Sequence, residues 1–186
     1  MSSLEEAYEY IKKNLKENRF IHTLGVVQEA KKLAKINGVS EEKAEMAALC
    51  HDIAKNIPKT KMIELMEENN IILNEDEKNS PSIWHSILGP VVAKNELGIE
   101  DEEILGAIRW HTTGKENMTK LEKIIYIADM IEPSRDFEGV NELRKVTLEN
   151  LNKGVLMGIN QTINFLIKKG NLIDLNTIKA RNSLID

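Results

Sequence analysis

The sequence is poor in cysteine and has no long apolar run. Its single cysteine, Cys50, can form no disulfide within the chain and provides no cysteine-rich zinc framework. No segment approaches the roughly 18 consecutive apolar residues that a membrane-spanning helix needs. The N-terminal segment MSSLEEAYEYIKKN carries charges throughout, unlike the apolar centre of a signal peptide. We therefore expect a cytoplasmic protein with no membrane partner.

Positive charge is also scarce. The formal net charge is −5, whereas a general nucleic-acid-binding protein would present a basic face, so no nucleic-acid partner is expected. A small anionic ligand is not excluded, because a few local Lys or Arg side chains can hold a phosphate. The 186 residues, 41% of them hydrophobic, are typical of one globular domain with a sizeable core.

Alternation of apolar and polar residues, the pattern of strands, is almost absent, and helical periodicity dominates. The sequence therefore predicts an all-α fold. Gly38 is expected to end one helix and Ser40 to cap the next, and residues 69–82 form the main irregular loop. Helices are expected over residues 4–17, 19–37, 41–54, 60–69, 83–97, 101–111, 119–131, 141–169 and 175–186.

The chain has four histidines, and each lies on the apolar face of a different predicted helix. Small or apolar residues stand three, four or seven positions away, which is the spacing of one helix face. A single histidine in such a place is more often a hydrogen-bonded core residue, but four together favour a cluster. They are His22, His51, His85 and His111.

Asp52 and Asp129 raise the same question, because each carboxylate lies in an apolar run. An unpaired buried charge is costly, and a metal ion is one of the few partners that satisfies histidine and carboxylate together. For Asp129 alone, a helix-terminal or salt-bridged acid is the simpler interpretation. With the four histidines, the two acids predict a buried His/Asp metal site at the centre of a helical bundle.

The ligand types restrict the metal without selecting one. Imidazole and carboxylate without thiolate suit iron, manganese, cobalt or zinc. Six candidate ligands exceed the four of a closed zinc site, so two ions bridged by Asp52 would use them better.

The order His22, His51–Asp52, Asp129 resembles the H…HD…D signature of the HD superfamily of metal-dependent phosphohydrolases. His85 and His111 match the two extra histidines of its dinuclear members. The surrounding segments are similar to the YqeK family of bacterial HD proteins: RFIHTLGV (19–26), AALCHDIAK (47–55), HSILGP (85–90), AIRWHTTG (107–114), KIIYIADMIEPSRDFEGV (123–140) and NTIKARN (176–182). The resemblance covers nearly the whole chain. It implies a single HD domain over residues 1–186, with a core at about 19–135 and C-terminal helices at about 141–186 packed on it.

The resemblance also implies an activity: symmetrical hydrolysis of diadenosine tetraphosphate to two ADP, with iron in the site. His22, His51, Asp52 and Asp129 would hold one iron, and His85 and His111 would serve a second ion or contact phosphate. Asp52 and Lys55 would be the catalytic residues. The implied nucleotide contacts are His22, Lys55, His85, His111, Thr112, Arg135 and the loop of Gly170, Asn171, Leu172, Ile173, Asp174 and Leu175.

Simpler interpretations stay open for some of these residues. Lys55 could be a surface lysine or a partner of Asp52, and Arg135 could pair with a nearby acid. Trp84 and Trp110, each directly before a histidine, are expected to pack in the core rather than to stack on adenine.

Pro90 departs from the alanine usual in the family, and it predicts a kink near His85 or a later helix start. The alternatives for the activity are another HD-type nucleotide phosphohydrolase, or a non-catalytic metal-containing nucleotide sensor. The apolar surface expected on helix 141–169 would suit a homodimer.

Overall fold

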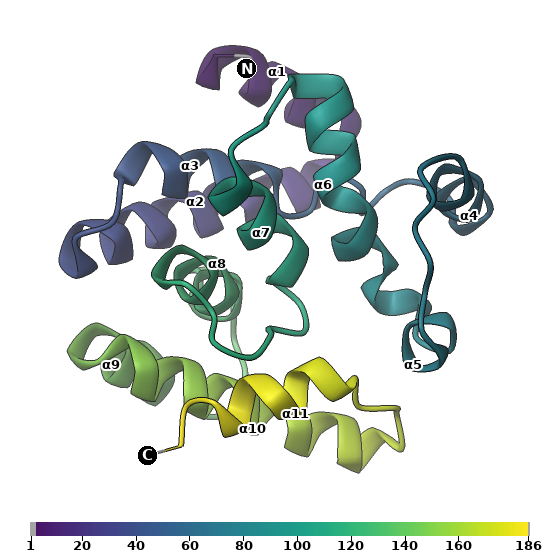
Figure 1. Cartoon of the computed structure of the whole chain (residues 1–186). Helices are drawn as coiled ribbons and strands as arrows, with labels where there is room; N and C mark the ends of the chain where they lie inside the picture. The colour runs from purple at the N-terminus through teal and green to yellow at the C-terminus, as the bar shows by residue number, and fades with distance from the viewer. Residues whose placement is uncertain (1–2, 186) are drawn as a thin grey trace.

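The fold is a bundle of helices, with no strand among residues 3–185, the part of the chain that this computed structural model describes (Figure 1). The predicted all-α class is confirmed. None of the helices in this described part is long and apolar enough to cross a membrane. In chain order they are α1 (Leu4–Asn14), α2 (Glu17–Asn37), α3 (Glu41–Cys50), α4 (Lys59–Glu68), α5 (Glu75–Lys78), the 3₁₀ helix η1 (Pro81–Ile83), α6 (Trp84–Leu97), α7 (Glu102–Trp110), α8 (Lys120–Ile131), α9 (Val140–Glu149), α10 (Leu151–Lys169) and α11 (Leu175–Asn182).

The connection between α2 and α3 follows the sequence signals. Gly38 takes a left-handed conformation with φ of 67°, which ends α2. The Ser40 side chain accepts a hydrogen bond from Lys43 N and so satisfies a free backbone donor at the start of α3. Both predicted caps are confirmed.

α3 ends at Cys50, earlier than the predicted residue 54. From there the backbone forms i→i−3 bonds, including Ile53 N to Cys50 O at 3.0 Å and Lys55 N to Asp52 O at 2.8 Å. His51 and Asp52 therefore lie in a tight turn directly after the helix. Adjacent side chains can converge in such a turn, whereas a regular helix would separate them by about 100°.

The prediction of one helix over residues 141–169 is wrong, because Asn150 separates α9 from α10. Asn150 has an extended backbone, with φ of −155° and ψ of 113°, and its side chain accepts a hydrogen bond from Lys153 N. An asparagine that caps a helix competes with continuation of the preceding one. Periodicity alone carries no sign of this break, because both helices keep an apolar face.

The loop before α6, the start of α6 and the end of the final helix can also be compared with prediction. A short helix, α5, lies inside the expected loop 69–82, where Asn74 and Glu77 cap each other reciprocally. α6 begins at Trp84 and continues through Pro90, so the alternative of a later helix start is wrong. The final helix ends at Asn182.

α8 lies at the centre of the molecule, with α2, α3 and α7 on one side and α9 and α10 on the other (Figure 1). Two glycines of α10 allow close approach of its neighbours. A Cβ on Gly154 would lie 2.6 Å from Thr147 Cα of α9, and one on Gly158 would lie 2.9 Å from Ile127 Cδ1 of α8. The C-terminal helices therefore pack directly on the helix that carries Asp129.

Candidate metal centre

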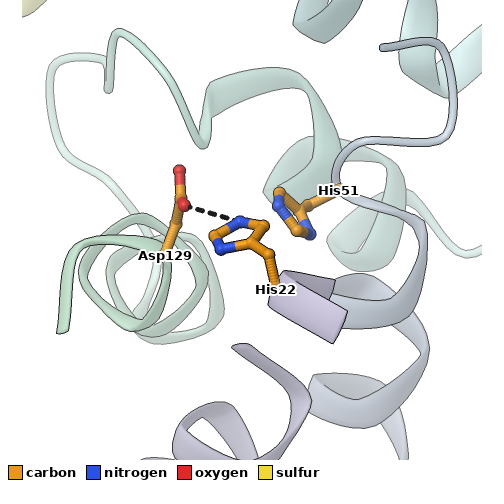
Figure 2. A group of neighbouring side chains, drawn as sticks. All are labelled: His22, His51 and Asp129. Carbon is orange, nitrogen blue, oxygen red and sulfur yellow. Dashed lines mark ion pairs between the residues drawn. The ribbon is translucent and has the colours of Figure 1, made fainter. Parts of the chain in front are cut away.

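The six predicted ligands come from five different helices or helix ends, and they meet in one place. Two triads have donor atoms within 4.8 Å of one another: His22, His51 and Asp129 (Figure 2), and His51, Asp52 and His111. Because His51 belongs to both triads, they form one continuous cluster. His85, on α6, extends this cluster, since its Nε2 lies 3.2 Å from both His111 Nε2 and Asp52 Oδ1.

Three of the histidines are held in one tautomer by their Nδ1 atoms. Nδ1 of His51 donates to Ala48 O at 2.6 Å, and Nδ1 of His111 donates to Ile108 O at 2.8 Å. Nδ1 of His22 donates to Glu132 Oε1 at 3.0 Å. A neutral imidazole has one N–H, so these bonds leave each Nε2 with a lone pair directed into the cluster.

The Nε2 atoms of His22 and His51 are buried and have no hydrogen-bond partner in the described part of the chain. Nε2 of His22 lies 3.1 Å from Asp129 Oδ1 (Figure 2), a separation that suits two ligands of one ion. Buried polar atoms are nearly always paired, so two unpaired lone pairs beside two carboxylates are the donor set that suits a cation. The residues present therefore fit a divalent metal.

The two oxygens of Asp52 face different groups. Oδ1 lies 3.2 Å from His85 Nε2 and 3.6 Å from His111 Nε2, whereas Oδ2 lies 3.4 Å from His51 Nε2. The side chain of Asp52 is buried, at 2% exposure, and its carboxylate lies among three imidazoles. Each oxygen of Asp52 therefore lies near a different set of imidazoles, so the carboxylate could provide one oxygen to each of two cations.

The charges in the cluster also suit a cation. Burial alone would raise the pKa of Asp52, but the neighbouring imidazoles of His51, His111 and His85 hold that pKa well below its usual range. The pKa of Asp129 is likewise lowered, against the effect of burial, by its neighbour His22 and by the charges of His51 and Arg135. Burial lowers the pKa of His85 to about 4, so this imidazole is neutral at pH 7.

Three predicted nucleotide contacts border the cluster. Nζ of Lys55 lies 3.1 Å from His85 Nε2, and Oγ1 of Thr112 lies 3.0 Å from His111 Nε2. Arg135 donates from Nη2 to Asp129 Oδ1 at 2.5 Å and from Nε to Asp129 O at 2.8 Å. Arg135 therefore pairs with a nearby acid, which is the simpler interpretation of this residue.

The predicted adenosine loop, residues 170–175, has no hydrogen bond to the six candidate ligands in the described part of the chain. Its Asp174 caps α11 by accepting a hydrogen bond from Asn176 N. Trp84 is buried and its Nε1 donates to Glu77 O at 2.7 Å, which confirms its prediction as a core residue. Trp110 is half-buried under the guanidinium of Arg109, whose Cζ lies 4.1 Å from its ring centroid.

Residues 19–134 match the model of the HD domain family. This chain belongs to the HD domain family. A Bacillus subtilis (strain 168) protein named "Bis(5'-nucleosyl)-tetraphosphatase, symmetrical" is 41% identical over 97% of both chains. A Halalkalibacterium halodurans protein of the same name is 40% identical over 97% of this chain and 96% of its own. The family resemblance predicted from the motifs is therefore confirmed.

A solved structure has the same fold as this HD-domain protein. It is a crystal structure from Clostridium acetobutylicum, described as a predicted HD superfamily hydrolase involved in NAD metabolism. Its TM-score is 0.95, at 46% sequence identity and with coverage of 99% of this chain and 97% of the other.

Two residues of this HD centre were missed from the sequence. Glu132, 1% exposed, accepts the Nδ1 proton of His22 and is itself bonded by Ser134, through N to Oε2 at 2.8 Å and through Oγ to Oε1 at 2.5 Å. Arg19 donates from Nη1 to Asp52 Oδ2 at 3.0 Å. Glu132 lies three residues after Asp129, and Arg19 lies three residues before His22. This i,i+3 spacing places each residue on the same helix face as a predicted ligand, and it is the signal in the sequence that points to them.

Proposed function

We propose that this protein is a metal-dependent hydrolase that splits diadenosine tetraphosphate symmetrically into two ADP. The observation that carries the proposal is a His/Asp cluster with unpartnered metal-binding atoms, in a chain 41% identical over 97% of its length to a relative named for this activity. Residues 1–186 are proposed to act as one HD domain, with its core at about 19–135 and the C-terminal helices at about 141–186 packed on that core.

The two overlapping triads support the proposed metal ligands. His22, His51, Asp52 and Asp129 hold one ion, and His85 and His111 serve a second ion or contact phosphate. Iron is the proposed metal, and manganese, cobalt and zinc use the same ligand types. When bound, such an ion activates water and neutralises charge on the phosphoryl oxygens. Asp52, with its two oxygens facing different imidazoles, is the proposed bridge and a catalytic residue.

Lys55 is the second proposed catalytic residue. Its Nζ lies 3.1 Å from His85 Nε2 and 3.8 Å from Asp52 Oδ1, and its side chain is 33% exposed. A cation at the rim of the cluster can contact a phosphate that enters from solvent. In the reaction, water oxygen bonds to one of the two central phosphorus atoms and the bridging P–O bond breaks, so that the second ADP leaves. Lys55 neutralises the negative charge that this step concentrates on the phosphoryl oxygens.

The remaining proposed nucleotide contacts lie at other edges of the cluster. Thr112 offers a hydroxyl beside His111, and Arg135 offers a guanidinium beside Asp129. The loop from Gly170 to Leu175 is proposed to contact adenosine. Supporting this, Leu172 and Leu175 of the loop are 54% and 61% exposed, so their apolar side chains are accessible to a base.

Two further proposals concern the setting of the protein. We propose that it acts in the cytoplasm. We also propose a homodimer through the surface of α9 and α10, because the apolar side chains of Leu148 and Ile167 are exposed there. Sedimentation equilibrium tests this, and a monomeric mass at micromolar concentration would contradict it.

Product analysis tests the proposed activity. Protein loaded anaerobically with Fe²⁺, Mn²⁺, Co²⁺ or Zn²⁺ is incubated with diadenosine tetraphosphate, and the nucleotides are separated by anion exchange. Metal content is measured on the same samples. We expect ADP alone, with turnover that depends on bound metal. Equal release of AMP and ATP would contradict the symmetrical reaction, and tight ADP binding without turnover by any metal-loaded sample would contradict an enzyme.

A further inference from the structure

We propose that a cavity beside His22, between Arg19 and Arg135, binds the second ADP half of the substrate. This inference rests on the proposed function. Symmetrical cleavage places the central phosphoanhydride at the cluster, so two equal nucleotide halves extend away from it. One half is proposed above to lie with Lys55 and the loop 170–175. The other half needs a second surface, and the proposed contacts supply no base-binding residues for it.

The groups around Asp52 already divide into two sides. Oδ1 faces His85, His111 and the ammonium group of Lys55, which lies 3.8 Å away. Oδ2 faces the guanidinium of Arg19 instead, at 3.0 Å. A cation therefore stands beside each oxygen of this carboxylate. A tetraphosphate centred on the cluster would meet one cation in each direction.

Two adjoining cavities begin on the Arg19 side. The first, of about 400 Å³, is lined by His22, Arg19, Asn18, Ser134, Arg135 and Asp136, together with Glu132 and Phe137. The second, of about 390 Å³, is lined by Met130, Gln161, Thr162 and Phe165, and shares Arg135 and Phe137 with the first. Pockets of roughly 300–1,000 Å³ are the usual size for small ligands. The path thus changes from charged and polar beside the cluster to mostly apolar farther away.

The first cavity suits the two phosphates of the second half. Arg19 uses only Nη1 in a protein hydrogen bond, and Arg135 uses Nε and Nη2, in the described part of the chain. Both side chains are about one-third exposed, at 32% and 38%, so their free N–H groups are accessible. The planar fork of arginine matches phosphate oxygens. Of the two acids here, Glu132 is already bonded to His22, and Asp136 can accept from ribose hydroxyls.

The second cavity suits the base. It contains Phe137 and Phe165, two of only three phenylalanines in the chain, and their rings are 37% and 56% exposed. Aromatic faces of this kind stack on nucleobases. In the same cavity, Oε1 of Gln161 is buried and has no hydrogen-bond partner in the described part of the chain. Rotation of the Gln161 side chain, which lines the cavity, would turn this unpaired acceptor toward the exocyclic amino group of an adenine held between the two rings.

ADP stoichiometry tests the subsite. Calorimetric titration of the metal-loaded protein with ADP is expected to give two ADP per chain. The double variant Phe137→Ala/Phe165→Ala should bind one, and its KM for diadenosine tetraphosphate should rise about 10-fold to 100-fold through loss of stacking. The matched control is Ile36→Ala/Ile63→Ala, which removes two exposed apolar side chains outside the cavity and should keep both ADP molecules.

Two single variants test the individual contacts. Arg19→Gln should lose the second ADP while metal content stays unchanged, so loss of metal instead would contradict its phosphate role. Gln161→Leu should lower the ratio of kcat/KM for diadenosine over diinosine tetraphosphate about tenfold, since inosine has no exocyclic amino group. An unchanged ratio would contradict recognition of adenine by Gln161.

The failures of this inference and of the proposed function are distinct. AMP and ATP as products would overturn the symmetrical activity, whereas ADP stoichiometry decides the subsite. One ADP per wild-type chain would overturn the subsite. So would a double phenylalanine variant that changes the sedimentation mass but not the ADP stoichiometry, because the cavity would then be a contact between two copies of the chain.

Discussion

Glu132 Oε1 lies 3.0 Å from Nδ1 of His22, and both side chains are buried. The carboxylate holds the imidazole in the tautomer whose Nε2 faces the cluster, and it increases the basicity of that nitrogen. Gly25, one turn after His22 on α2, makes room for this pair. A Cβ at Gly25 would lie 2.6 Å from Glu132 Oε2, which is too close for the carboxylate to stay in place.

We predict that Glu132→Ala lowers metal affinity about 10-fold to 100-fold, the usual cost of removing a partner behind a metal-bound histidine. Gly25→Ala should act in the same direction, because its methyl group displaces the carboxylate. Metal affinity is measured by competition with a chromogenic chelator. Glu138→Ala, at an exposed acid nearby, is the control and should bind metal as the wild type does. Unchanged affinity in both test variants would show that the pair is not part of the metal site.

Asp52→Ala is expected to lose bound metal and to lower kcat/KM by more than about a hundredfold, because it removes a ligand and not only its support. The bundle should still fold, since Arg19 is 32% exposed and can turn to solvent when its partner is lost. Elemental analysis gives the metal content, and far-ultraviolet circular dichroism gives the helix content. Glu149→Ala, at an exposed acid of α9, controls for a general effect of lost charge. Full metal content in Asp52→Ala would disprove the site.

The pKa of His85, lowered by burial to about 4, predicts a pH-dependent stability of the metal-free protein. In the unfolded chain His85 binds a proton with its ordinary pKa of about 6.5, whereas in the folded chain it stays neutral until the pH approaches 4. The stability present above pH 6.5 is therefore lost as the pH falls toward 4. His85 alone should lower the free energy of unfolding by about 3 kcal/mol at pH 4, relative to its value above pH 6.5. Urea unfolding at pH 7.5, 6, 5 and 4 measures the loss.

His85→Gln is the reference for that experiment, because glutamine does not titrate. Acidic residues such as Asp52, whose pKa is lowered in the folded protein, also lose stabilising interactions at low pH in both proteins. The difference between the two pH curves therefore isolates His85. Parallel curves would mean that His85 titrates normally and is not held neutral by burial.

Gly154→Ala should destabilise the protein by up to about 2 kcal/mol, although alanine favours helix. The added methyl group would lie 2.3 Å from Thr147 Oγ1 and 2.6 Å from its Cα, so α9 must move. Overpacking of this kind costs about 1–3 kcal/mol, offset by about 1 kcal/mol of helix propensity. Urea unfolding measures the change. Lys153→Ala, exposed on the same turn, should stay within about 0.5 kcal/mol of wild type.

The sequence by itself determined the helical class, the caps at Gly38 and Ser40, and the helix faces that carry the six candidate ligands. Helix periodicity and capping are local properties, because they depend on residues only three or four positions apart in the sequence. The break at Asn150 is not visible in the hydrophobic pattern, because its side chain caps α10 without interrupting that pattern.

Only the tertiary structure decided which faces meet. Glu132 looks like an ordinary acid at a helix end until α2 packs on α8 and brings His22 to it. Arg19 looks like a surface residue until the turn after α3 places Asp52 beside it. The two cavities between Arg19 and Phe165 join segments more than a hundred residues apart. Contacts of this kind depend on how helices pack over long sequence separations, and that packing is a property of the whole buried core rather than of any one segment.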